Sequence, residues 1–168
     1  MEYSLTIPGK TMTWKRAERN KKTGAVYNDK AMSQRQEAIG YLWKAANPGH
    51  RRWEADVPLW SKFEFVFDRP KGHYGTGKNA GIIKPDKLYL RPIHQKSGDF
   101  DNLAKLIADA LNTVAYVDDS QIAEVHGLSK RYIWPGEEPF TKVTLGVLLP
   151  SALQPPEDAV APQLPLAP

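Results

Sequence analysis

The stretch from Asp99 to Asp119 reads DFDNLAKLIADALNTVAYVDD. On a helix, where successive residues are about 100° apart, Asp101, Lys105 and Asp109 follow one another along one face. The opposite face is apolar and consists of Leu103, Leu106, Ile107, Ala110 and Leu111. The spacing therefore predicts an amphipathic helix that packs its apolar side on a core and turns its charges outward.

Acidic residues flank this helix on both sides. Asp99 precedes it, at a position where an aspartate can cap the free amides. The apolar run Val114–Val117 then leads to Asp118 and Asp119, and we expect it to deliver them, as the end of a strand, to the start of the helix. Several carboxylates and one lysine would then meet at one end of the fold. An ordinary solvated helix face is the simpler interpretation of the charged stripe alone.

Clustered carboxylates repel one another unless a positive charge joins them. Hard divalent cations prefer oxygen ligands, so we expect Mg²⁺ to be the bound metal ion and Mn²⁺ to be able to replace it. Such ions assist phosphodiester hydrolysis, because they activate water and neutralise charge on the leaving oxygen. A lysine in the cluster could steady the phosphate in the transition state.

These residues resemble the RusA-type Holliday junction resolvases, endodeoxyribonucleases of bacteria and their phages. The family pattern is Asp-x-Asp-Asn-Leu-x-Lys, then Asp-Ala-Leu, then Asp-Asp-x-Gln, and every fixed position is matched between Asp99 and Gln121. The resemblance implies a homodimer that cuts four-way DNA in recombination and repair. It also implies residue roles: Asp99, Asp101 and Asp119 as catalytic metal ligands and Lys105 as the catalytic lysine. Asp118 is a further candidate ligand. We expect Asn102 and Asp109 to support this set, with Asp109 pairing with Lys105 at i, i+4.

The composition is that of an ordinary globular protein. The chain has 168 residues, a formal net charge of +4 and no cysteine, which excludes disulfides and cysteine-rich zinc sites. The N-terminus does not resemble a signal peptide and no apolar run is long enough for a membrane span. We therefore expect a cytoplasmic protein of a bacterium or a phage-infected cell, with no membrane association.

A long segment rich in Gly, Pro and Lys lies between Asp68 and Gly98. Its glycines do not have the spacing of a phosphate-binding loop, so no nucleotide cofactor is expected. The string from His73 to Gly81 resembles an insertion of phage-type members of the same family. The excess of basic residues favours DNA contact over a plain solvated loop. The predicted DNA-contacting residues, two of them from a later strand, are Lys71, Lys78, Lys84, Lys96, Lys130 and Arg131.

The remaining pattern predicts an α+β domain over residues 1–149, with a mixed sheet of four or five strands packed by two main helices. Alternation predicts strands at Tyr3–Ile7 and Phe63–Phe67, and further strands are expected over Gln121–Tyr132 and Lys142–Leu149. Helical spacing predicts the other helix over Met32–Ala46. Residues 150–168 are rich in Pro and Ala and are expected to form a disordered tail.

The sequence thus predicts a metal-dependent Holliday junction resolvase. Two alternatives remain open at this point. One is a DNA junction-binding protein without catalysis, in which the carboxylates only form salt bridges. The other is a metal-dependent nuclease that uses the same cluster on flaps or on RNA.

Overall fold

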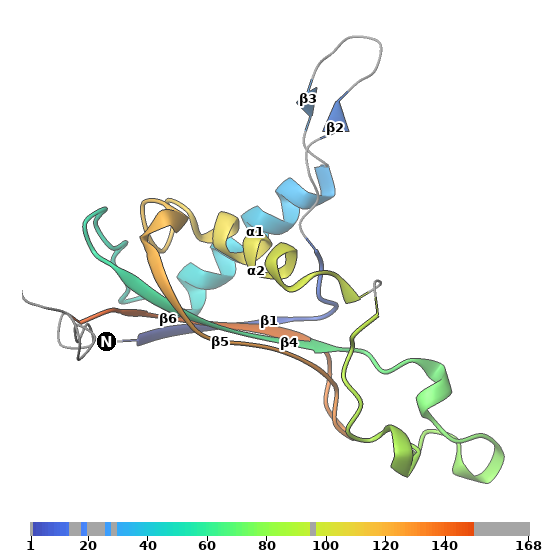
Figure 1. Ribbon diagram of the computed structural model, residues 1–168. Helices are drawn as coiled ribbons and strands as arrows, with labels where there is room; N and C mark the ends of the chain where they lie inside the picture. Colours follow the sequence, from blue (N-terminus) through green and yellow to red (C-terminus); the bar gives the residue numbers. More distant parts are fainter. Residues whose placement is uncertain (1, 14–17, 20–25, 28–29, 95–96, 150–168) are drawn as a thin grey trace, which may run out of the picture.

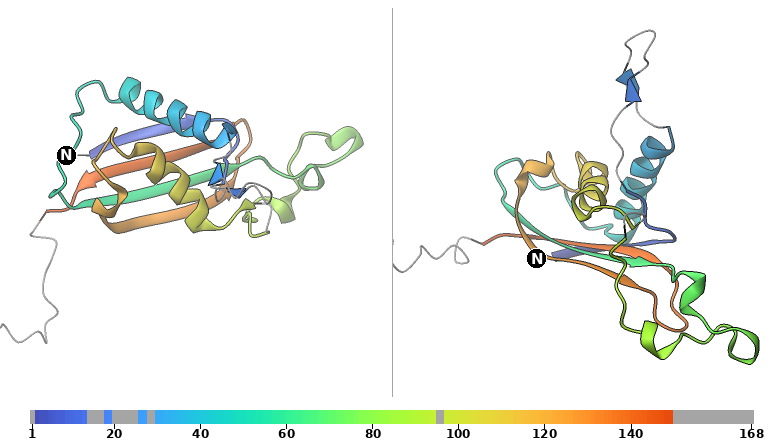
Figure 2. Two further views of the ribbon diagram at one scale, coloured as in Figure 1. Left: turned by 90° about the horizontal axis from the view of Figure 1, so that it is seen from above. Right: turned by 45° about the vertical axis from the view of Figure 1, so that its right-hand side comes forward.

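The computed structural model describes residues 2–13, 18–19, 26–27, 30–94 and 97–149. Four strands form one sheet and two helices cover one of its faces (Figures 1 and 2). The strands are β1 (Glu2–Pro8), β4 (Leu59–Phe67), β5 (Ile122–Tyr132) and β6 (Phe140–Val147), and the helices are α1 (Lys30–Ala46) and α2 (Phe100–Leu111). The α+β prediction with a mixed sheet and two main helices is confirmed.

The sheet has the order β1-β6-β4-β5 and mixes the two kinds of pairing. β6 pairs antiparallel with β1 and with β4, whereas β4 and β5 are parallel, with Leu59 opposite Ile122 and Phe67 opposite Tyr132. Parallel neighbours need a long crossover connection. Here the crossover contains the loop after β4 and then α2, so α2 begins near the end of β4 and runs back over the sheet (Figure 2).

The core lies between the helices and the sheet. The predicted apolar face of α2 is buried, as are Ile39 and Trp43 from α1 and Phe63 and Phe65 from β4. β4 begins at Leu59, four residues before the predicted start. The apolar pattern did not indicate these first residues, because a buried position among them is occupied by a polar residue. Ser61 is fully buried and its hydroxyl donates a hydrogen bond to the carbonyl of Glu124 at 3.4 Å.

The apolar run Val114–Val117 is a turn, and the prediction that it forms a strand is wrong. Thr113 has a left-handed backbone conformation with φ of 62°, and the Ala115 amide bonds back to the carbonyl of Leu111 at 2.9 Å. Tyr116 forms only isolated bridges, with Trp53 and with Asn112. The chain therefore turns at the end of α2 and does not extend from it.

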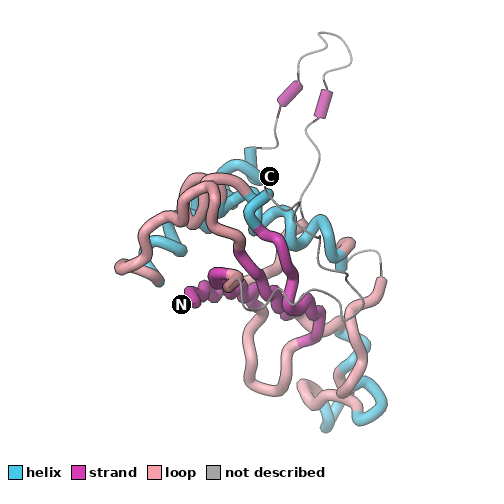
Figure 3. The backbone as a smooth tube through the Cα atoms, turned by 60° about the vertical axis from the view of Figure 1, so that its left-hand side comes forward, coloured by secondary structure: helices cyan, strands magenta, loops and turns pink. Residues whose placement is uncertain are grey.

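The segment after β4 projects beyond the end of the sheet, and we call residues 69–94 the arm (Figures 1 and 3). It contains three short 3₁₀ helices, η1 (Lys71–His73), η2 (Gly77–Asn79) and η3 (Pro85–Lys87). Two further short strands, β2 (Glu18–Arg19) and β3 (Val26–Tyr27), pair antiparallel. Among the residues described, no helix is long and apolar enough to cross a membrane. The predicted tail, 150–168, lies outside them.

Candidate active site

The first turn of α2 carries two exposed carboxylates. Asp99 occupies the N-cap position with extended backbone, but its side chain makes no capping hydrogen bond. The position expected for Asp99 is therefore correct, whereas the capping contact is absent. Asp101 follows in the first turn and is also exposed. Both carboxylates point away from the buried face of the helix, where solvent or DNA can reach them.

Gly98 fixes the entry to this turn. Its φ of 73° lies in the left-handed region, and a Cβ built on it would lie 2.0 Å from Cγ2 of Thr13. Lys130 on β5 donates a hydrogen bond from Nζ to the Gly98 carbonyl at 3.0 Å. This predicted DNA-contacting lysine thus holds the chain immediately before Asp99.

Lys105 and Asp109 form the ion pair expected for residues one helical turn apart. The Lys105 Nζ lies 3.2 Å from Oδ1 of Asp109, and the lysine side chain is 46% exposed. Asp109 is more buried, at 21% side-chain exposure. The pairing predicted from the spacing is confirmed, and it directs the lysine toward the second half of α2.

Asp118 and Asp119 are presented by a 3₁₀ turn, η5 (Asp119–Gln121), and not by the end of a strand. Asp118 caps the turn, and its Oδ1 accepts a hydrogen bond from the Ser120 amide at 3.0 Å. The buried Gln121 side chain accepts from the amides of Val117 and Asp118, at 2.8 and 3.2 Å.

Gln121 also ties this turn to the rest of the fold. Its Nε2 donates to the carbonyls of Glu54 and Val57, at 2.6 and 3.1 Å. Sequence reasoning identified Gln121 as a pattern position without assigning it a role. Both the oxygen and the nitrogen of its side-chain amide bond to backbone groups, so Gln121 fixes the turn that carries the two aspartates.

Asp119 lies in a negative environment. Burial raises the pKa of this carboxyl, and the carboxylates of Asp109 and Asp118 raise it further, against the opposing effect of Lys105. A hydrogen bond shared with the Asp109 carboxyl contributes in the same direction. The Asp118 pKa is lowered instead, because Ser120 hydrogen-bonds to it. A pair of adjacent carboxylates such as Asp109 and Asp119 is stabilised either by a shared proton or by a bound cation.

Tyr116 is a buried phenol near the same acids. It is fully buried, and its hydroxyl donates to the Ala108 carbonyl at 2.8 Å. Its pKa is raised by burial and then by the charges of Asp119, Asp109 and Asp118. The three carboxylates are therefore close enough to this buried phenol to raise its pKa.

Asp119 lies close to Lys105 and Asp109, which act on its pKa in opposite directions. Asp101 and Asp109 are two turns apart, which corresponds to about 12 Å along a helix axis. Within the described ranges, no three or more His, Asp or Glu side chains form a group that could hold a metal ion. No such group joins Asp99, Asp101 and Asp119 among these residues, so their convergence on one ion remains a prediction. Carboxylate oxygens are the donors that a hard cation prefers.

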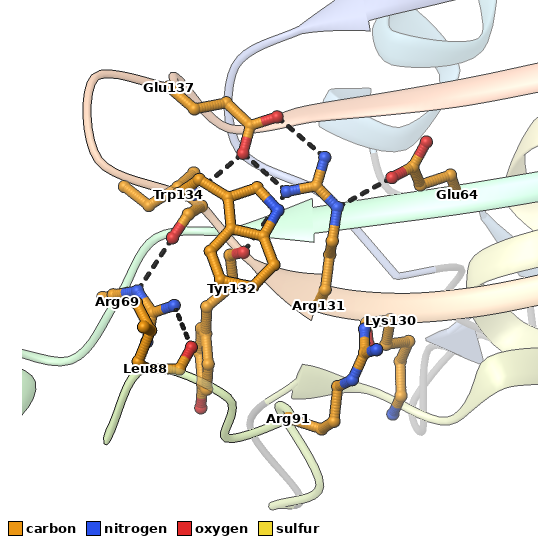
Figure 4. A network of polar contacts seen from close by, with 10 residues as sticks. Glu64, Arg69, Leu88, Arg91, Lys130, Arg131, Tyr132, Trp134 and Glu137 are labelled. Carbon is orange, nitrogen blue, oxygen red and sulfur yellow. Dashed lines mark hydrogen bonds and ion pairs between the residues drawn. The ribbon is translucent and has the colours of Figure 1, made fainter. Parts of the chain in front are cut away.

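The predicted DNA-contacting residues have different surroundings. Lys71 and Lys78 are exposed on the arm, and Lys84 donates from Nζ to the Gly72 carbonyl at 3.0 Å. Lys96 lies outside the described residues. The Arg131 guanidinium is held internally by Glu64 and Glu137 (Figure 4). DNA contact remains a prediction for the set, and Arg131 has a structural role in addition.

A family model described as endodeoxyribonuclease RusA matches residues 8–145, which is most of the chain. The chain belongs to the RusA endodeoxyribonuclease family. This RusA-family protein is accordingly an endodeoxyribonuclease that resolves Holliday junctions, DNA is its partner, and the family depends on divalent metal ions. The match includes β4, the arm, α2 and η5. No curated protein matches the chain.

Proposed function

We propose that this RusA-family protein is a Mg²⁺-dependent resolvase of four-way DNA junctions that acts in recombination and repair. Mn²⁺ would substitute, because it also prefers oxygen ligands. The observation that carries the proposal is the exposure of Asp99, Asp101 and Lys105 on the first two turns of α2, inside the region that matches the family.

Each residue of the proposed site has a distinct task. Asp99, Asp101 and Asp119 would hold the cation, with Asp118 as a further ligand. The cation would supply charge neutralisation at the phosphate and activation of water. Lys105 would oppose the negative charge that develops on the phosphoryl oxygens during hydrolysis.

Supporting residues would hold this set in place. Asp109 orients Lys105 through the 3.2 Å ion pair. The half-buried Asn102 would support the ligands from within α2. Backbone phosphates would be contacted by lysines on and beside the arm, because polyanion binding requires neutralising cations. These lysines are Lys71, Lys78, Lys84, Lys96 and Lys130.

We also propose that the working form is a homodimer. A four-way junction is resolved by two symmetric cuts, and two cuts need two active sites related by a twofold axis. The catalytic domain would span residues 1–149, with 150–168 as a tail, and the protein would act in the cytoplasm of a bacterium or a phage-infected cell.

The proposal is tested by offering one preparation four substrates: a four-way junction, a flap, a duplex and an RNA hairpin. We expect paired cuts in the four-way junction with Mg²⁺ or Mn²⁺, slower or absent cleavage of the other three, and no cleavage in EDTA. Faster cleavage of the flap or the RNA would contradict the proposed substrate. Cleavage in EDTA would contradict the metal dependence.

A second experiment separates two possible ligand sets. Mn²⁺ binding is measured by calorimetry for Asp99→Asn, Asp101→Asn, Asp119→Asn and Asp109→Asn. We expect the first three variants to lose the site and Asp109→Asn to keep it. If Asp109→Asn lost the site and Asp101→Asn kept it, the cation would belong to the facing pair Asp109 and Asp119 instead.

A further inference from the structure

The arm is held together by its own backbone. The amide of Gly75 donates to the Ile82 carbonyl at 2.9 Å, and the amide of Lys84 donates to the His73 carbonyl at 2.9 Å. A Cβ built on Gly75 would lie 2.6 Å from the Asn79 carbonyl oxygen, so only glycine permits this close approach. The arm therefore has a defined shape, although its sequence has no periodicity.

A buried arginine fixes the arm to the end of the sheet. Arg69 is 6% exposed, and its guanidinium donates to the carbonyl of Ile133 at 2.8 Å and to those of Lys87 and Leu88 at 2.7 Å (Figure 4). The first carbonyl follows β5 and the other two belong to the arm. Its carbon Cζ also lies 6.0 Å from the centre of the Trp134 ring.

Large apolar side chains are nevertheless exposed on this ordered arm. The exposed fractions are 78% for Tyr89, 44% for Leu90 and 88% for Ile93. The Tyr89 ring meets the partly exposed Trp134 edge-on, with centroids 6.1 Å apart. We call Tyr89, Leu90, Ile93 and Trp134 the ridge. Tyr89, Leu90 and Ile93 lie within five residues of one ordered segment, and exposed apolar side chains presented in this way are typical of an interaction surface.

The charge around the ridge indicates the chemistry of its partner. The arm carries Lys71, Lys78, Lys84, Lys87 and Arg91. The one acid of the arm, Asp86, is paired with Lys87 at 2.8 Å. Cations on the same arm as exposed aromatic rings are suited to a nucleic acid whose bases are accessible, because the phosphates meet the cations and the base faces meet the rings.

We propose that the ridge stacks on unpaired bases at the branch point of junction DNA, so that the arm distinguishes branched DNA from duplex. In a continuous duplex the base faces are covered by their neighbours, whereas bases at a branch point can unstack. This inference rests on the proposed function for its substrate but not on the metal site. Arg69 would act as a positioning residue, because it presents the ridge in a fixed place.

The test measures binding in EDTA, where no cleavage is needed. Labelled four-way junction and a duplex of the same sequence are titrated with wild type, Tyr89→Ala, Ile93→Ser and Tyr89→Phe. We expect Tyr89→Ala and Ile93→Ser to weaken junction binding about tenfold and to leave duplex binding unchanged. Tyr89→Phe should bind as wild type does, because the ring is retained.

A fluorescent base analogue at the branch point gives a second readout. We expect wild-type protein to change the emission of the analogue and Tyr89→Ala to change it much less. An analogue placed within a duplex branch of the junction should respond to neither protein. Lys84→Ala is the matched control: it should weaken junction and duplex alike and reduce the salt dependence of binding, which Tyr89→Ala should not change.

Several outcomes would overturn the inference. Equal losses on junction and duplex would show that the ridge does not recognise branched DNA. Unchanged binding by both variants would show that it does not touch DNA. A shift from dimer to monomer in Tyr89→Ala, by sedimentation, would assign the ridge to contact between two copies. Failure of the proposed function gives a different result from failure of this inference, because junction binding would remain intact while Mg²⁺-dependent cutting would be absent.

Discussion

The Nζ of Lys105 lies 3.2 Å from Oδ1 of Asp109, one turn further along α2. The pair is partly exposed, so it contributes little to stability, about 0.3–0.5 kcal/mol for pairs of this kind. Fold stability therefore does not require a lysine here. The role proposed for Lys105, at the scissile phosphate, is chemical instead.

Lys105→Met should lower the rate of junction cleavage by about 10²–10³-fold, because charge on the phosphoryl oxygens would lose its partner. The thermal midpoint should change little. Cleavage rate and thermal unfolding are measured side by side, with Lys62→Met, at an exposed position on β4, as the matched control. A Lys105→Met enzyme with wild-type rate would show that another cation serves the phosphate.

Asp109→Asn should lower the pKa of Asp119. In the wild type, the Asp109 carboxylate raises this pKa both by its charge and by its hydrogen bond, so its neutralisation removes both effects. Titration of the aspartate carboxyl carbons by NMR in metal-free buffer measures the change. An unchanged Asp119 titration would show that Asp109 does not act on this pKa.

Gln121→Leu should destabilise the protein by about 2–3 kcal/mol, because it leaves buried backbone amides and carbonyls without their partners. Junction cleavage should fall as well, since Gln121 fixes the turn that carries Asp118 and Asp119. Denaturant unfolding and cleavage rates at a temperature where the variant remains folded test both parts. Ser129→Ala, at an exposed position on β5, is the control and should change neither.

Glu137→Gln should remove an acid-sensitive part of the stability. Hydrogen bonds from Arg131 lower the Glu137 pKa below its ordinary value of 4.5. A lowered pKa stabilises the fold above the unfolded value, and this contribution is lost as the pH falls through the folded value. At neutral pH the variant should lose about 1–3 kcal/mol.

The difference between the wild type and Glu137→Gln should therefore shrink as the pH is lowered below 4.5. Thermal midpoints of both proteins between neutral pH and about pH 3 measure this difference. A difference that stays constant across the range would show that the carboxylate contributes no pH-dependent stability.

Elements with a regular period were predictable from the sequence. The spacing of Leu103, Leu106 and Ile107 is sufficient to place α2, because a helix buries one face whatever its partner is. The parallel pairing of β4 with β5 was not predictable, because it depends on the path of the crossover. The prediction of a strand at Val114–Val117 was wrong, since the left-handed backbone of Thr113, where the turn begins, has no signal in a residue of that type.

The charged residues were the hardest to place. Arg69 and Arg131 belong to an excess of basic residues that suggests DNA contact. In the structure Arg69 is buried and donates to backbone carbonyls, and Arg131 is paired with two glutamates. Sequence alone does not reveal such partners, because they come from segments far apart in the chain. The pairing of Lys105 with Asp109 was predictable, since both residues belong to one helix.

Asp101→Asn removes one of the carboxylates at the start of α2 that are proposed to hold the cation for DNA hydrolysis. This exposed substitution removes one charge and changes almost no volume. Cleavage of a four-way junction in Mg²⁺ is measured next to junction binding in EDTA. We expect cleavage to be lost and binding to be kept, whereas cutting at the wild-type rate would contradict the proposed metal site.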